Sequence, residues 1–169
     1  NARRMDKGYP IIRYADILLM YAESLNHLTK AYEIKLGDET YSVSRDLNEI
    51  KSAFNLVRHR SGMPGISNND LADEETFQKI LEIERMKEFL HEGQRYFDVR
   101  RWGIYEETEN ETIMGMNVDG SKENFYQRTV PNTSRIGARL VHKKLYLLPI
   151  PLNEIRKLPS CDQNPDWES

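Results

Sequence analysis

The stretch that decides the fold is ILEIERMKEFLHEGQRYFDVRRWG, residues 80–103. Its apolar residues recur at helical spacing, which predicts a helix from about Asp73 to Leu90. Gly93 breaks this helix because glycine adopts the left-handed backbone that commonly ends a helix. The residues after Gly93, up to Gly103, predict a short helical turn.

Charged residues in this stretch predict an ion-pair network, here called the clasp, between the helix and the turn after it. Glu84 and Glu88 lie one turn apart, and we expect one of them to pair with Arg95, Arg100 or Arg101. If that pair is buried, Arg95→Ala costs about 3 kcal/mol. Ligand binding is the alternative, because aromatic residues interleave with the arginines. The clasp residues are Glu84, Glu88, Arg95, Asp98, Arg100 and Arg101.

The remaining residues up to Gly103 also favour helices. Residues 9–28 predict a helix that starts at Pro10 and, with apolar residues on nearly every face, is buried on most sides. A second helix is expected from about Asp46 to Arg60, where Asp46 and Glu49 resemble a capping box.

The texture changes after Gly103 and predicts a loop-rich part over residues 104–169. An acidic loop is expected at 106–112, short strands at 125–130 and 144–151, and a helical turn at 151–158 with Asn153 as its cap. The prediction is therefore a mainly α fold, helical over residues 1–103, in which both parts form one structural unit.

Composition excludes several classes of protein. The chain has 169 residues and a formal net charge of -3, which gives no reason to expect nucleic-acid binding. Cys161 is the single cysteine, so no intrachain disulfide can form. No stretch approaches the ~20 apolar residues of a membrane span. The chain begins without an initiator Met or a signal peptide, and we expect a fragment of a longer protein.

Catalytic and metal-binding patterns are missing from the sequence. His91-Glu92 begins like the zinc motif H-E-x-x-H, but Arg95 stands at the fifth position, so the second ligand on that helix face is absent. No phosphate loop, nucleophile elbow or placed carboxylate pair occurs, and we expect neither an enzyme nor a metal or cofactor. Aromatic rings in loop-rich sequence can stack on sugars, and the candidates for this role are Tyr105, Tyr126 and Trp167.

Four segments, taken in order, resemble the C-terminal region of the SusD/RagB family: residues 13–26, 47–66, 80–103 and 144–167. The third carries the pattern E-R-x-x-E-x-x-x-E-G-x-R-x-x-D-x-x-R-W-G. The match falls on Glu84, Arg85, Glu88, Glu92, Gly93, Arg95, Phe97, Asp98, Arg100, Arg101, Trp102 and Gly103. The last segment resembles the closing L-x-P-I-P and Q-N-P-G-W patterns, with Asp166 in place of the glycine.

This resemblance implies a tetratricopeptide-like α-α superhelix with irregular loops and a few short strands. It further implies non-catalytic glycan binding at the outer face of the bacterial outer membrane and delivery to a SusC-like TonB-dependent transporter. The lipid anchor of such a protein would lie upstream of this chain. The alternatives are a RagB-like peptide binder and a scaffold segment that only supports docking to the transporter. No fixed ligand-binding motif of the family matches a residue here.

Overall fold

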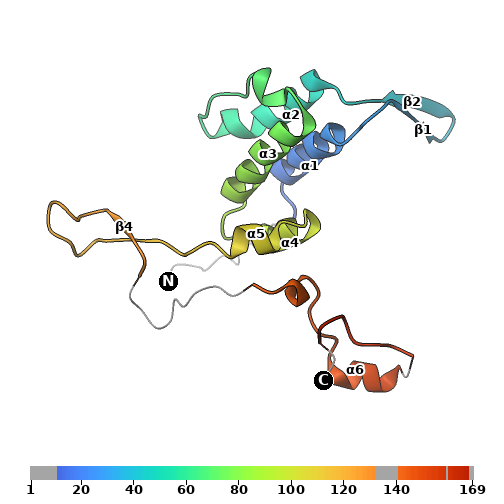
Figure 1. The fold of residues 1–169 in the computed structure, drawn as a ribbon. Helices are drawn as coiled ribbons and strands as arrows, with labels where there is room; N and C mark the ends of the chain where they lie inside the picture. The colour runs from blue at the N-terminus through green and yellow to red at the C-terminus, as the bar shows by residue number, and fades with distance from the viewer. Residues whose placement is uncertain (1–10, 132–140, 159, 168–169) are drawn as a thin grey trace, which may run out of the picture. The chain divides into compact units, whose positions relative to one another are not determined.

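The computed structural model describes residues 11–131, 141–158 and 160–167 (Figure 1). The chain divides into two compact units, Asn1–Glu92 (unit 1) and Gly93–Ser169 (unit 2). Helices dominate and the strands are few and short, which confirms the predicted mainly α fold. The boundary that the sequence texture suggests after Gly103 stays a prediction. None of the described helices is both long enough and apolar enough to cross a membrane.

The core of unit 1 lies among three helices: α1 (Tyr14–Asn26), α2 (Leu47–Arg60) and α3 (Glu74–Glu88). Helix α1 packs against both α2 and α3 (Figure 1). The rings of Phe54 and Phe77 meet edge to face, with centroids 5.3 Å apart. Other buried side chains come from all three helices and from the 3-10 turn η1 (Asn69–Leu71), and they include Leu19, Ala22, Ile50, Val57, Leu71 and Leu81.

Aspartates fix the starts of α2 and α3. The Asp46 carboxylate accepts hydrogen bonds from the backbone N–H of Asn48 at 2.8 Å and of Glu49 at 3.0 Å. Asp73 accepts from the Thr76 N–H at 2.7 Å, and this hydrogen bond holds the pKa of Asp73 below its ordinary value. These bonds satisfy N–H groups that have no partner inside the helix, and both predicted helices are confirmed.

Helix α1 begins later than predicted, at Tyr14, and Pro10 lies outside the described residues. The Asp16 carboxylate accepts from the backbone N–H of Arg13 at 3.2 Å, which holds the first turn in place. The prediction that this helix is buried on most sides is wrong. Its inner face is buried, whereas Tyr14, Ile17 and Tyr21 are 71%, 49% and 45% exposed.

An apolar groove between α1 and α2 accompanies this exposed face. It has a volume of about 350 Å³. Tyr14, Ile17 and Tyr21 of α1 line one side, and Leu56 of α2, itself 53% exposed, lines the other. Apolar residues lie on nearly every face of α1, but α2 and α3 cover only part of the helix surface.

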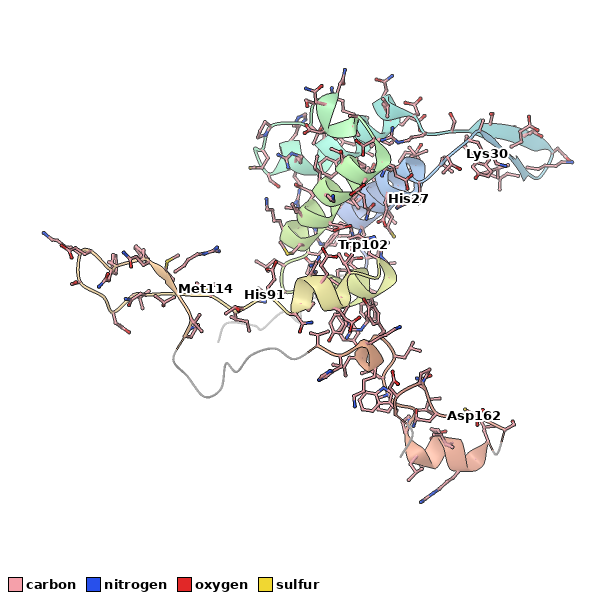
Figure 2. The ribbon with its side chains drawn as sticks, viewed as in Figure 1. His27, Lys30, His91, Trp102, Met114 and Asp162 are labelled. Atoms are coloured by element: carbon pink, nitrogen blue, oxygen red, sulfur yellow. The ribbon has the colours of Figure 1, made fainter. Side chains whose placement is uncertain are left out.

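A hairpin that the sequence analysis did not predict follows α1. Strand β1 (Tyr32–Leu36) pairs with antiparallel β2 (Glu39–Val43), in a register that sets Tyr32 opposite Val43. Gly37, with φ +63°, forms the turn in a left-handed conformation that suits glycine. Beyond Lys30 the strand side chains are almost all exposed (Figure 2).

Unit 2 holds α4 (Gln94–Arg101), α5 (Tyr105–Glu109), the two-residue strands β3 (Gly115–Met116) and β4 (Arg128–Thr129), the 3-10 turn η2 (Lys143–Tyr146) and α6 (Leu152–Lys157). The predicted turn after Gly93 is confirmed as α4. The prediction of an acidic loop at 106–112 is wrong in part, because its first residues form the helix α5. The strand expected at 144–151 is also wrong, because η2 occupies its start. At the start of α6 the N-cap position is held by Pro151 rather than Asn153, and no side-chain hydrogen bond caps the helix there.

Candidate functional site

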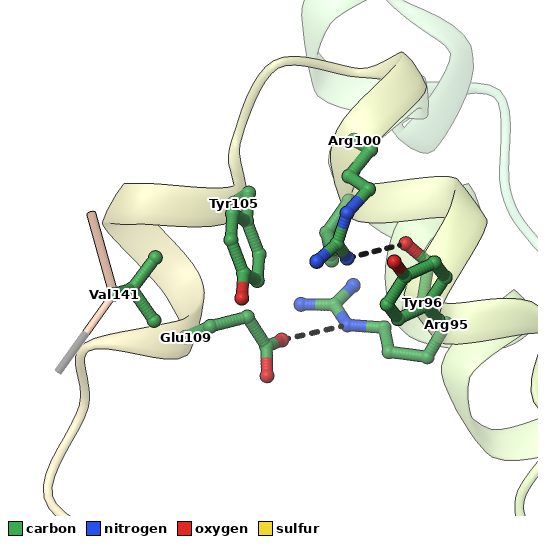
Figure 3. A pocket seen from close by; sticks show the side chains of 7 residues that line it. Arg95, Tyr96, Arg100, Tyr105, Glu109 and Val141 are labelled. Carbon is green, nitrogen blue, oxygen red and sulfur yellow. Dashed lines mark hydrogen bonds and ion pairs between the residues drawn. The ribbon is translucent and has the colours of Figure 1, made fainter. Parts of the chain in front are cut away.

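A cavity of about 390 Å³ in unit 2 is the candidate site (Figure 3). Two consecutive short helices build most of it. Its lining residues are Arg95, Tyr96, Val99 and Arg100 from α4, Tyr105 and Glu109 from α5, and Val141. The volume lies at the lower end of the range, about 300–1,000 Å³, that small-molecule sites occupy.

The backbone turn at the end of α4 brings these two helices together. Gly93, with φ +81°, precedes the helix, and Gly103, with φ +74°, ends it in a left-handed conformation. The N–H of Gly103 donates to the Arg100 carbonyl at 3.1 Å, and the Ile104 N–H donates to that of Val99 at 3.0 Å. The chain therefore turns tightly after α4, and α5 packs against it.

Arg100 lies between two tyrosine rings. Its guanidinium carbon is 3.6 Å from the ring centroid of Tyr96 and 4.0 Å from that of Tyr105. Nη1 of Arg100 also donates to the Tyr96 backbone carbonyl at 2.8 Å (Figure 3). Cation–π contact on both faces and this hydrogen bond hold the guanidinium in one orientation.

Arg95 forms the second positive group of the site. Its Nε donates to the Glu109 carboxylate at 3.3 Å, a long hydrogen bond, and the two side chains are 29% and 19% exposed. Figure 3 shows the guanidinium groups of Arg95 and Arg100 pointing into the same space, between the rings of Tyr105 and Tyr96. Two guanidinium groups and one carboxylate thus line the cavity, and the charge of the site is positive.

Tyr105 is held from behind by Tyr146. The Tyr105 N–H donates to the Tyr146 hydroxyl at 3.1 Å, and this hydroxyl donates to the Gly103 carbonyl at 2.8 Å. The two rings meet edge to face with centroids 5.5 Å apart. These contacts fix the wall of the cavity that faces Arg100.

Of the three aromatic candidates from the sequence, Tyr105 lines the cavity. Tyr126 is 61% exposed, has φ +60° and packs its ring against Phe125. The Trp167 indole N–H donates to the backbone carbonyls of Lys144 at 3.0 Å and Leu147 at 2.8 Å. Tyr126 and Trp167 are not among the described residues that line this cavity.

The clasp carboxylates of α3 have ion-pair partners within unit 1. Glu84 pairs with Arg58 at 2.7 Å, and Glu88 pairs with Arg13 at 2.8 Å and with Arg60 at 2.6 Å. These arginines come from α2 and from the residue before α1, and the sequence analysis did not name them. The expected pairing of Glu84 or Glu88 with Arg95, Arg100 or Arg101 stays a prediction.

The clasp residues of α4 have contacts of their own in unit 2. Asp98, which is buried, pairs with Arg101 at 2.9 Å. Arg95 and Arg100 line the cavity, and their expected structural role in the clasp stays a prediction.

Sequence reasoning missed Tyr96, Val99, Glu109 and Val141 as lining residues. Tyr96 and Arg100 stand four residues apart on one helix, a spacing that brings side chains into contact and gives a usable signal. Glu109 lies in an acidic run in which nothing distinguishes it from its neighbours. Val141 carries no local signal at all, since only the fold places it beside the cavity.

Comparison with known proteins shows the family. The profile of the SusD family (SusD_RagB) matches residues 1–167, and the chain belongs to this family. Among solved structures, a SusD-like protein from Bacteroides fragilis NCTC 9343 is similar with 29% identity and a TM-score of 0.70, over 93% of this chain and 25% of that one. The comparison with curated proteins returns no match.

A second solved protein, named BT4246, gives the same result. It is 26% identical with a TM-score of 0.68, over 96% of this chain and 25% of that one; in a further structure of the protein the values are 25% and 0.66. The chain therefore spans about 25% of the length of the solved proteins that it matches.

Proposed function

We propose that this chain is part of a non-catalytic cell-surface protein that binds glycans and passes them to a SusC-like TonB-dependent transporter in the outer membrane. The observation that carries the proposal is the family match over residues 1–167. A lipid anchor on a segment outside this chain would hold the protein at the outer face of the membrane. The family resemblance supports this location.

The cavity between α4 and α5 supports a binding role in this part of the protein. Its donors are the guanidinium groups of Arg95 and Arg100, and its acceptors are the Glu109 carboxylate and the tyrosine hydroxyls. A sugar has many hydroxyl groups that both donate and accept, so it fits a lining in which both kinds of group converge. Contact of the ligand with Tyr105, which forms one wall of the cavity, and delivery to a transporter are part of the proposal.

Isothermal titration calorimetry of the full-length protein against a panel of polysaccharides and oligosaccharides tests the binding role. We expect saturable binding of at least one glycan, with no release of smaller sugars during incubation. Tyr105→Ala should weaken binding, whereas the matched variant Tyr126→Ala, at an exposed ring away from the cavity, should not. Release of sugars would establish an enzyme instead.

Copurification tests the partner. When the membrane is solubilised in mild detergent, the tagged protein should carry a TonB-dependent barrel with it. Copurification without binding of any glycan or peptide would reduce the role of the protein to a scaffold. Binding of peptides, with no glycan bound, would replace the glycan by a peptide as the transported nutrient.

A further inference from the structure

We infer that the cavity between α4 and α5 recognises a carboxylate group on its ligand, so that the sugar bound there is an acidic one, a uronate. This inference rests on the proposed function, since it names the class of glycan. Nothing in the family match points to this site or to this charge. The charges, the hydrogen-bond donors and the position of the aromatic rings in the cavity support it.

Charge is the first step. Arg95 and Arg100 bring two positive groups to the lining, and Glu109 brings one negative group. The Glu109 contact with Arg95 is long, 3.3 Å, and reaches only the Nε atom. A carboxylate placed between the two guanidinium groups would balance the remaining positive charge, and arginine binds carboxylates in a charge-assisted, often two-pronged geometry.

The supply of hydrogen-bond donors points the same way. Each guanidinium has five N–H donors, and hydrogen bonds to the described residues of unit 2 use one donor of Arg95 and one of Arg100. Nε of Arg100 is buried without a hydrogen-bond partner among the described residues. The two side chains are therefore held in place but far from saturated, which leaves donors for a ligand.

The position of the rings decides between stacking and charge. Tyr96 and Tyr105 each turn one face to the Arg100 guanidinium, at 3.6 Å and 4.0 Å. Those faces are occupied, so a pyranose ring cannot stack on them. The rings instead keep Arg100 rigid before the ligand arrives, which reduces the entropy lost on binding. Recognition at this site therefore depends on charge and hydrogen bonds.

A uronate matches the lining better than a peptide carboxylate does. It carries its carboxylate and several hydroxyls on one ring, and Tyr105 and Glu109 line the same cavity as the guanidinium of Arg95 (Figure 3). Glu109 would accept from a sugar hydroxyl while the arginines bind the acid group. The volume of about 390 Å³ suits a terminal sugar rather than a long segment.

The test compares an oligogalacturonate with the neutral galactose oligomer of the same linkage and length, by calorimetry on the full-length protein. We expect the acidic oligomer to bind about tenfold or more tightly, as charged hydrogen bonds predict. The difference should shrink in 0.5 M salt, on the order of what screening of partly exposed charges gives.

Variants locate the effect at the cavity. Arg95→Gln and Arg100→Gln should each remove most of the preference for the acid, and Arg100→Lys should weaken it because lysine lacks the planar fork. Arg128→Gln, at an exposed arginine in β4, is the matched control and should change nothing. Circular dichroism melts identify any variant that fails to fold. If the Arg100 variants fail to fold, Arg95→Gln still tests the inference.

Three outcomes would overturn the inference. Equal binding of neutral and acidic oligomers, unchanged in Arg95→Gln and Arg100→Gln, would refute it and leave the proposed glycan-binding function intact. Binding of peptides through their terminal carboxylate would refute the claim that the ligand is a sugar, although the cavity would still be a carboxylate-binding site. A protein that binds no glycan in the wider panel would fail the proposed function as well.

Discussion

Arg13 grips both carboxylate oxygens of Glu92, with Nε 2.9 Å from Oε2 and Nη2 2.8 Å from Oε1. Its Nη1 reaches the Glu88 carboxylate at 2.8 Å. One guanidinium thus ties the start of α1 to Glu88 at the end of α3, 75 residues away, and to Glu92, 79 residues away. The two carboxylates raise the pKa of Arg13 above its ordinary value.

Removing Arg13 should destabilise unit 1. Arg13→Ala leaves Glu88, whose side chain is 8% exposed, with one partner fewer and leaves Glu92 without this pair. The arginine itself is 23% exposed, so we expect a loss of about 2 kcal/mol, between the values for surface and buried pairs. Urea denaturation followed by circular dichroism measures it. Arg13→Lys should recover only part of the loss, and a loss no greater than that of Arg128→Ala would contradict the prediction.

The Arg58–Glu84 pair should show coupling. The two side chains are 17% and 11% exposed and their atoms lie 2.7 Å apart. Glu84→Leu alone should cost about 3 kcal/mol, because it leaves a mostly buried guanidinium without its carboxylate. The double variant Arg58→Met, Glu84→Leu should cost at least ~1 kcal/mol less than the sum of the single changes. Strict additivity in urea midpoints would show that the pair carries no interaction.

Arg95→Ala should affect stability little. Its pair with Glu109 is long and partly exposed, at 3.3 Å with 29% and 19% exposure. The cost should be about 1 kcal/mol or less, as for surface pairs, in place of the 3 kcal/mol expected for a buried clasp. A thermal melt decides between the two values. A drop of several degrees beyond that of Arg128→Ala would return Arg95 to a structural role.

Phe77 should dominate the core of unit 1. It is fully buried, and its ring packs edge to face on Phe54. Phe77→Ala should lower the free energy of unfolding by about 3–5 kcal/mol through lost burial and the cavity left behind. Phe77→Leu should cost less, about 1.5 kcal/mol, because most of the volume remains. Phe125→Leu, at a ring that is 46% exposed, provides the control, and an equal effect of both leucine changes would be inconsistent with this core.

The Tyr21–Glu49 hydrogen bond should appear in the pH dependence of stability. Glu49 accepts from the Tyr21 hydroxyl, and this bond raises the pKa of Tyr21 above its ordinary value. A raised pKa in the folded state means that the stabilisation is present below about pH 10, the unfolded pKa, and is lost as pH rises through the folded pKa. Unfolding free energies between pH 9 and 11 should therefore depend less on pH in Tyr21→Phe than in the parent.

The control for this titration is Tyr32→Phe in β1, where the ring contacts Lys30 rather than a carboxylate. Its pH dependence should equal that of the parent. Because the chain has nine tyrosines, the difference in tyrosinate absorbance between the parent and Tyr21→Phe at high pH reports the Tyr21 titration. A parent and a Tyr21→Phe protein with the same slope in this range would rule out the effect.

Local signals explain which parts of the fold could be predicted. Asp46 and Asp73 cap their helices through hydrogen bonds to residues two or three positions away, so sequence alone locates both starts. The hairpin could have been found, since Gly37-Asp38 separates two runs rich in strand-forming residues. The start of α1 was harder, because Pro10, Ile11 and Ile12 suit a helix equally well.

The site could be predicted only in part, because its geometry depends on the turn at Gly103. Tyr96 and Arg100 share one helix face, which sequence spacing shows. The contact of Arg100 with Tyr105 requires the tight turn after α4, and Val141 arrives from a distant part of unit 2. The sequence predicts a clasp for Arg95 and Arg100, but charge in a short stretch does not show that the same arginines line a cavity.

The exposed groove between α1 and α2 has a practical consequence. Tyr14, Ile17, Tyr21 and Leu56 are exposed to water in this groove. When the chain is purified alone, it therefore presents an apolar surface that favours association. We expect such a surface to increase the fluorescence of the dye ANS and to delay elution from a phenyl resin. We also expect it to bind chaperones that recognise apolar segments. Glutamate substitutions at Ile17 and Leu56 are a direct way to obtain a well-behaved sample without touching the cavity in unit 2.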